Sequence, residues 1–220
     1  MSAKSARTPL SNAELAKLTA EEFVRLKLTD DEKHRLREIN RERARQREKR
    51  TARLLAEGQP IVADLRAIGR NVTSVWDMLK IPNRHADAIP VLLKHLRLPY
   101  SDRTREGIAR ALAIPDAKDA WPILVEEYRK APMGVENGFR LGAKSGFAVA
   151  LSATVTANTI DELIALAKDR SHGSSRLLLL RGLRRSRAPA AKKALEELAS
   201  DPELSKEIAS WRRARRTPTT

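Results

Sequence analysis

The hydrophobic and polar positions follow the period of an α-helix along almost the whole chain. From residue 58 onward, amphipathic segments of about 10 to 14 residues alternate with turns marked by Pro, Gly, Asp or Ser. No segment shows the sustained alternation that is typical of a half-buried strand. The pattern therefore predicts an all-α protein.

The part before residue 58 has a different pattern. Residues 1–29 predict a flexible segment with short helices, and residues 30–57 predict one long charged helix because no helix breaker interrupts them. Between residues 33 and 53 the only large apolar residues are Leu36 and Ile39, so a coiled coil is not expected. Two interpretations of this helix stay open. It is either a solvated helix that projects from the domain, or a basic arm that docks on nucleic acid or on an acidic surface.

The second part of the chain contains a repeated two-helix unit. The sequence DAIPVLL at residues 87–93 recurs 32 positions later as DAWPILV at residues 119–125. The sequence REGIARAL at residues 105–112 is followed by the similar segments 144–151 and 176–183. Small residues in these segments would let neighbouring helices approach closely. A unit of this kind cannot bury its apolar face alone, so several units must stack.

At these residues the sequence resembles the HEAT-repeat family, and it is also similar to bacterial HEAT repeat domain-containing proteins of unassigned role. In that family the first helix often carries a proline, as Pro90 and Pro122 would, and an Asp and a cation often follow, as Asp102 and Arg105 would. The resemblance implies a right-handed α-solenoid of about four to five HEAT-like helical hairpins over residues 58–216. The long charged helix would precede it, and a disordered tail, residues 217–220, would follow it.

Composition excludes several classes of protein. The chain has 220 residues, no cysteine and four scattered histidines, so we expect neither a disulfide scaffold nor a metal site, and no cofactor. No apolar stretch approaches the roughly 20 residues that span a bilayer, and the first residues lack the apolar core of a secretory signal. We therefore expect a cytoplasmic protein with no membrane partner.

No catalytic constellation is complete in the sequence. The segment 138–145 resembles a phosphate loop, but it has three residues instead of four between its glycines. His85 and His95 are ten residues apart, lack the spacing of a zinc-binding pair, and are expected at the surface or at an interface. We therefore expect a protein that is not an enzyme and has no small-molecule substrate.

One enzymatic class remains as a remote alternative. Some HEAT-like solenoids are DNA glycosylases that use tryptophans and an Asp on a basic concave face. This chain has Trp76, Asp77, Trp121 and Trp211. However, Trp76 and Trp121 have the spacing of core residues, and Trp211 lies near the end of the chain, so the set needed for this chemistry is incomplete.

The positive charge is the main indication of function. The chain has 43 Lys and Arg against 28 Asp and Glu, a net charge of +15. The charge is not uniform, because residues 170–193 contain eight basic residues and no acidic one. Arg181, Arg184 and Arg185 share one helix face, and Leu179, Leu180 and Leu183 are expected on the core side of that helix. Such clustering indicates an anionic partner.

The candidate partner- or phosphate-binding residues are all cations of the repeats and of the C-terminal end. The cluster that starts at Arg181 is either neutralised by Glu196 and Glu197 or left for a ligand, and both alternatives stay open. The repeat aligns Arg176 with Lys144 and Arg105, a row in which the HEAT family usually has a structural cation. The complete set is Arg181, Arg184, Arg185, Arg187, Arg110, Lys144, Arg176, Arg212 and Arg213.

These observations predict a non-catalytic binding scaffold whose concave face holds a partner protein with an acidic surface. The alternative is sequence-nonspecific nucleic-acid binding through phosphate contacts at the basic patch. Only 4% of the residues are aromatic, so few side chains are available for stacking on the bases of a single strand. If the chain binds nucleic acid, we therefore expect a double-stranded DNA or a structured RNA.

Overall fold

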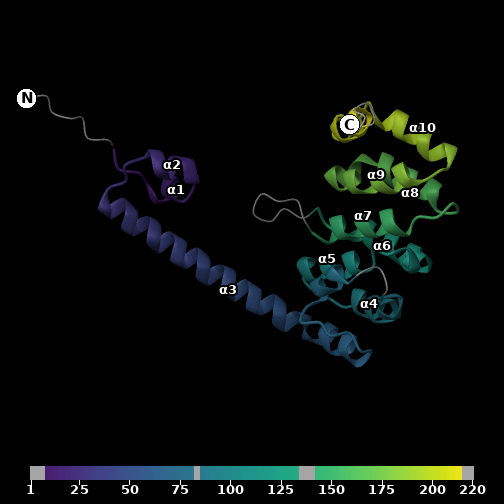
Figure 1. Cartoon of the computed structure of the whole chain (residues 1–220), viewed down its shortest axis with the longest axis horizontal. Coiled ribbons are helices and arrows are strands. Elements are labelled where there is room, and N and C mark those ends of the chain that lie inside the picture. Colours follow the sequence, from purple (N-terminus) through teal and green to yellow (C-terminus); the bar gives the residue numbers. More distant parts are fainter. Residues whose placement is uncertain (1–7, 82–84, 134–141, 215–220) are drawn as a thin grey trace, which may run out of the picture. The chain divides into compact units, whose positions relative to one another are not determined.

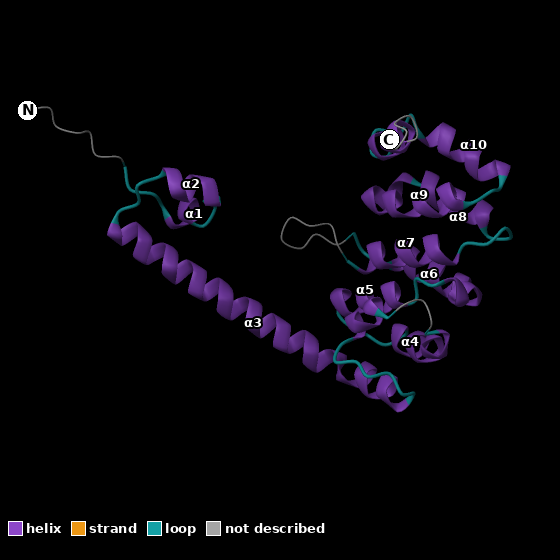
Figure 2. Ribbon diagram, in the orientation of Figure 1, coloured by secondary structure: helices purple, strands orange, loops and turns teal. Residues whose placement is uncertain are grey.

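The chain is all-helical in the computed structural model, which describes residues 8–81, 85–133 and 142–214, the last three of these without their side chains (Figure 2). No strand occurs in these described ranges. The prediction of an all-α protein is confirmed. The chain divides into two compact units, Met1–Leu55 and Ala56–Thr220. No helix in the described part of the chain is long and apolar enough to cross a bilayer.

The first unit contains two short helices and most of a long one. Helices α1 (Asn12–Leu15) and α2 (Ala20–Arg25) each begin with a capping box, in which a Ser or Thr and a Glu three residues later satisfy the free N–H groups of the first turn. Helix α3 (Asp30–Ala67) opens with three acidic residues, as the helix dipole favours. Leu15 and Leu28 are the buried apolar side chains of this unit.

Helix α3 continues ten residues beyond its predicted end at residue 57. The sequence predicts that this helix ends before Gly58, but both Gly58 and Pro60 lie inside it. Ile61 and Leu65 are completely buried in the core of the second unit, and this burial offsets the cost of the two helix-weakening residues. The helix ends before Gly69, whose φ of 82° is the left-handed conformation of a helix C-cap.

The second unit is a succession of helix pairs (Figure 1). The first element after α3 is a 3₁₀ helix over residues 75–80. The elements in chain order are η1 (Val75–Lys80), η2 (Ala86–Ala88), α4 (Ile89–Leu96), α5 (Asp102–Ala111), η3 (Pro115–Ala120), α6 (Trp121–Lys130), α7 (Ala143–Thr154), α8 (Ile160–Lys168), η4 (Arg170–Ser175), α9 (Arg176–Arg185), α10 (Pro189–Leu198) and α11 (Ser205–Ala214).

The repeated prolines mark a change of helix type. Pro90 and Pro122 lie in the first turns of α4 and α6, where the missing proline N–H has no partner to lose. A 3₁₀ helix directly precedes each of these turns. The repeated sequence around each proline therefore encodes a 3₁₀ segment followed by an α-helix.

Within the second unit, the two helices of each pair pack together, and each pair packs on the next pair along the chain. Helix α5 contacts α7, and α7 contacts α9, while α4, α6 and α8 each pack on the helix that follows in the same pair (Figure 1). The expected close approach is present at the glycines. A Cβ atom at Gly146 would lie 2.8 Å from the Glu106 carbonyl oxygen, and one at Gly182 would lie 2.8 Å from Leu163 Cδ2. One continuous apolar core runs through these layers.

Candidate functional site

Helix α9 separates its leucines from its arginines. Leu179, Leu180 and Leu183 are buried in the core, which confirms their predicted side of the helix. Arg181, Arg184 and Arg185 are exposed, also as predicted. The next two helices, α10 and α11, pack beyond α9, and a groove lies between the three.

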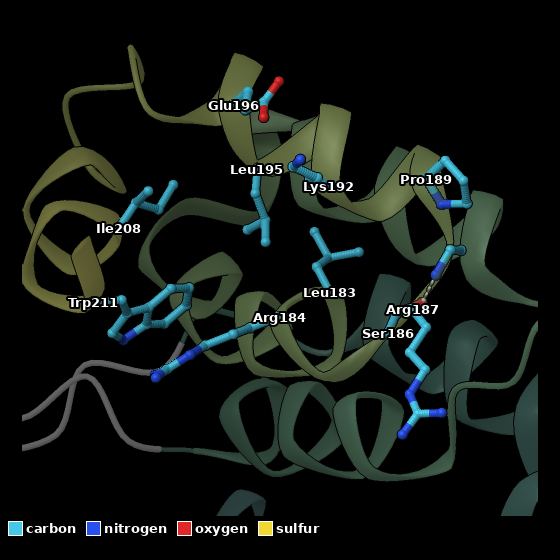
Figure 3. Close-up of a pocket in the computed structure, with 11 residues that line it drawn as sticks. Leu183, Arg184, Ser186, Arg187, Pro189, Lys192, Leu195, Glu196, Ile208 and Trp211 are labelled. Carbon is cyan, nitrogen blue, oxygen red and sulfur yellow. Dashed lines mark hydrogen bonds between the residues drawn. The ribbon is translucent and has the colours of Figure 1, made fainter. Parts of the chain in front are cut away.

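The groove has a volume of about 590 Å³. Leu183, Leu195 and Ile208 point into the same space from three different helices and form an apolar floor (Figure 3). Three cations and one acid lie around it. The lining residues are Leu183, Arg184, Ser186, Arg187, Ala188, Pro189, Lys192, Leu195, Glu196, Ile208 and Trp211.

Trp211 closes one end of this groove. The guanidinium carbon of Arg184 lies 4.7 Å from the centroid of the Trp211 ring, within the range of a cation–π contact (Figure 3). The indole Nε1 of Trp211 donates a hydrogen bond of 3.1 Å to Glu207 Oε1, one turn earlier in the same helix. These two contacts orient the ring, so one wall of the groove is aromatic and positively charged.

Internal neutralisation of the arginines by Glu196 and Glu197, one of the two alternatives left open by the sequence, is not seen in the described residues. The Glu197 carboxylate instead pairs with Lys168 Nζ at 2.6 Å, and the hydrogen bond from this ammonium lowers the pKa of Glu197. Within the described part of the chain, no carboxylate lies within ion-pair distance of Arg181, Arg184, Arg187 or Lys192. The rim of the groove is therefore positive, although Glu196 contributes one negative charge to it.

Two of the candidate cations lie in the protein interior, which corrects their assignment to a binding surface. Lys144 is buried, and its Nζ donates hydrogen bonds of 3.1 Å to the carbonyl oxygens of Tyr128 and Ala131 at the end of α6. Burial lowers the pKa of Lys144. These contacts give Lys144 a structural role, because it satisfies carbonyl groups that the helix end leaves open.

Arg176 is only 1% exposed. Its guanidinium donates to Asp201 Oδ2 at 2.9 Å and to Glu203 Oε2 at 2.7 Å. The hydrogen bond from Arg176 is the main reason why the pKa of Asp201 is lowered. Arg176 thus links α9 to the turn before α11, and no partner can reach it.

Two further candidates are engaged by groups of the same unit. Arg110 Nε donates to Glu106 Oε1 at 2.8 Å, one turn earlier in α5. Arg185 donates to the carbonyl oxygen of Ser152 in α7. The side chains of Arg212 and Arg213 lie outside the described residues. Of the nine candidates, Arg184 and Arg187 line the groove, and Arg181 lies on the exposed face of α9.

His85 and His95, expected at the surface or at an interface, are buried inside the second unit. His95 Nδ1 is 2.8 Å from the Tyr100 hydroxyl, and His95 Nε2 is 2.9 Å from Asp64 Oδ2. His85 Nε2 is 2.9 Å from the carbonyl oxygen of Ala111. Both rings therefore tie segments of the core together. No cluster of three or more metal-ligating side chains occurs in the described residues.

The residues named for the glycosylase alternative do not meet in one site. Trp121 is buried, as its spacing predicts, and donates from Nε1 to Glu162. Asp77 caps the 3₁₀ helix η1 and binds Lys80, and this hydrogen bond is the main reason why the pKa of Asp77 is strongly lowered. Trp211 belongs to the groove at α9 instead.

Lys192, Ile208 and Trp211 were not among the partner- or phosphate-binding candidates drawn from the sequence. Ile208 and Trp211 are three residues apart, so they share a helix face, and this spacing is the sequence signal for one wall. Comparison of the chain with protein-family models, with curated proteins and with solved structures finds no match. The functional argument therefore depends on the groove itself.

Proposed function

We propose that this chain is a non-catalytic binding scaffold, a right-handed HEAT-like solenoid that holds an acidic segment of a partner protein. Support for the solenoid comes from the internal repeat and from the packing of each helix pair on the next. In such an arrangement the second helices of successive units, here α5, α7 and α9, form one face of the protein. The groove at α9 would be one end of that face.

The observation that carries the proposal is the combination of an apolar floor with cations that have no carboxylate partner among the described residues. Leu195 and Trp211, which are both half-buried, offer a surface that phosphate groups cannot use but that apolar side chains can. Arg184 and Lys192 would pair with Asp or Glu side chains of the same segment. An amphipathic acidic peptide satisfies both features, and a nucleic-acid backbone satisfies only the second.

A pull-down with charge-reversed variants tests the proposal. The groove variant carries Arg184→Glu and Lys192→Glu. The matched control carries Arg97→Glu and Lys118→Glu, two exposed cations of the same unit outside the groove, so that both variants lose the same net charge. Each variant is immobilised as the full chain, and the captured proteins are compared after nuclease treatment.

We expect a set of proteins that survives nuclease treatment, binds the control variant, and is at least tenfold depleted on the groove variant. Equal capture by the groove and control variants would contradict the assignment of the site. Loss of all captured protein after nuclease treatment would contradict the scaffold itself.

A further inference from the structure

Residues 45–53 of α3 are exposed around the whole circumference of the helix. Every one of these nine residues is exposed to solvent. The sequence RQREKRTAR contains five cations and one acid, and Ala52 is its only apolar residue. A protein partner would find no apolar surface to bury on this segment, whereas protein interfaces have an apolar core.

The cations of this segment differ from those at the start of the same helix. Near the start, Lys33 pairs with Asp30 and Arg35 pairs with Asp31, each at 2.9 Å. Further along, no described carboxylate lies within ion-pair distance of four cations, namely Arg45, Arg47, Lys49 and Arg53. Their mutual repulsion destabilises the free helix, and an anionic ligand would relieve it.

Three of these cations form a row along one side of the helix, and the fourth lies on the opposite side. Arg45, Lys49 and Arg53 are spaced four residues apart and form one row. Arg47 lies about 160° around the helix axis from both Arg45 and Lys49, because each residue turns the helix by about 100°. A single flat anionic surface can contact either this row or Arg47, but not both. Two separate rows of negative charge can contact both sides of the helix.

The two phosphate backbones that border the major groove of DNA supply this arrangement. The groove is about 12 Å wide, and an α-helix with its side chains is about 10 to 12 Å across. A helix lying in the groove would therefore direct the row of three cations toward one backbone and Arg47 toward the other. The major groove of duplex RNA is deep and narrow, and a single strand has no paired backbones, so neither fits in the same way.

We infer that residues 45–53 of α3 form a site for double-stranded DNA, in which the helix lies in the major groove and its cations contact phosphates on both strands. The site belongs to the first unit and does not depend on the groove at α9. Phosphate contacts dominate it, so its affinity depends weakly on base sequence.

Fluorescence anisotropy of the full chain with an arbitrary DNA duplex of about 20 base pairs tests the inference. Contact with four phosphates gives a salt slope of about −3.6, so affinity should fall about 100-fold between about 50 and about 200 mM salt. The DNA variant carries Arg45→Ala, Arg47→Ala, Lys49→Ala and Arg53→Ala. The matched control carries Arg181→Ala, Arg184→Ala, Arg187→Ala and Lys192→Ala.

We expect the DNA variant to bind at least tenfold more weakly and with a slope smaller by about 3 to 4, while the control retains both affinity and slope. Alanine favours helix, so circular dichroism should show no loss of helix, and a second variant with Gln at the same four positions should behave alike. No binding at the lower salt concentration, or unchanged binding by the DNA variant, would overturn the inference. Equal affinity for duplex RNA or for single-stranded DNA would overturn the major-groove geometry.

The pull-down tests substitutions in α9 and α10, and the DNA titration tests substitutions in α3. The scaffold proposal and the DNA-binding inference can therefore fail independently of each other.

Discussion

Ten of the twelve residues of α7 are buried, whereas all nine residues at positions 45–53 of α3 are exposed. The two helices are stabilised in different ways. Helix α7 is held by packing on α5, α6 and α9, and even its lysine is enclosed by protein. The exposed segment of α3 depends on backbone hydrogen bonds and on local side-chain pairs. A cation therefore contributes to stability in one region and remains open to a ligand in the other.

Removal of a buried cation should have the largest effect. Arg176→Ala leaves Asp201 without its closest partner, and we expect a loss of about 3 kcal/mol of unfolding free energy. Arg170 Nε, 3.4 Å from Asp201, keeps the loss at the lower end of the usual range. Urea unfolding followed by tryptophan fluorescence measures the loss, since all three tryptophans belong to the second unit.

The exposed Arg181 on the same helix supplies the control for this measurement. Arg181→Ala should change the unfolding free energy by less than about 0.5 kcal/mol. Similar values for the two variants would mean that burial does not distinguish these cations. That result would contradict the conclusion that a buried cation stabilises the fold and an exposed cation does not.

Glycine substitutions should have opposite signs in the two helices. A Cβ at Gly146 of α7 would lie 2.8 Å from a backbone oxygen, which cannot move away, so we expect Gly146→Ala to cost about 1 to 3 kcal/mol. Gly58 lies inside α3 and has no atom within 4 Å of the added Cβ, so Gly58→Ala should add about 0.5 to 1 kcal/mol. The urea midpoints of both variants measure this, and a gain at position 146 would contradict the close packing.

The sequence predicts much of this contrast between the packed helices and the exposed part of α3, but it does not predict where α3 ends. The helical period and the internal repeat predict the helix pairs, and the spacing along α9 predicts which side its leucines face. The continuation of α3 through Pro60 could not be predicted, because it depends on the burial of Ile61 and Leu65 by later segments. Local propensity at a glycine and a proline favours a break, and tertiary packing overrides it.

For the candidate site too, the sequence predicts some features, and others depend on how distant segments pack. The repeat aligned Arg176 with Lys144, and the HEAT resemblance implied a structural cation in that row, but their partners are carbonyl groups and carboxylates from other segments. The groove needs Leu183 and Trp211 to meet, 28 residues apart in sequence. Charge clustering located one wall of the groove, and only the packing of α11 supplied the other.

A smaller effect should appear on acidification. Burial, and next the positive charge of Lys144, lower the pKa of His172 below its ordinary value of 6.5. The unfolded chain then takes up a proton more readily than the folded one, so stability should fall as the pH drops below about 6.5. Urea midpoints at about pH 7.5 and about pH 5.5 measure this fall.

His172→Gln should flatten the pH dependence in that window, whereas His34→Gln, in the first unit and outside the unit that the tryptophans report on, should leave it as in the parent chain. Asp201, whose pKa is lowered by Arg176, contributes a separate loss only in more acidic solution. An unchanged slope in the His172 variant would exclude this side chain as the origin.

The smallest effect should come from the ion pairs of α3. Arg41 and Glu38 are 2.6 Å apart, and both side chains are more than half exposed, at 66% and 54%. Water and salt screen such a pair, so a double-mutant cycle with Arg41→Ala and Glu38→Ala should give a coupling below about 0.5 kcal/mol that vanishes near 1 M salt. Helix content by circular dichroism as a function of temperature measures it. A coupling above about 1 kcal/mol would mean that exposed pairs hold α3 together, and its cations would then be less available to an anionic ligand.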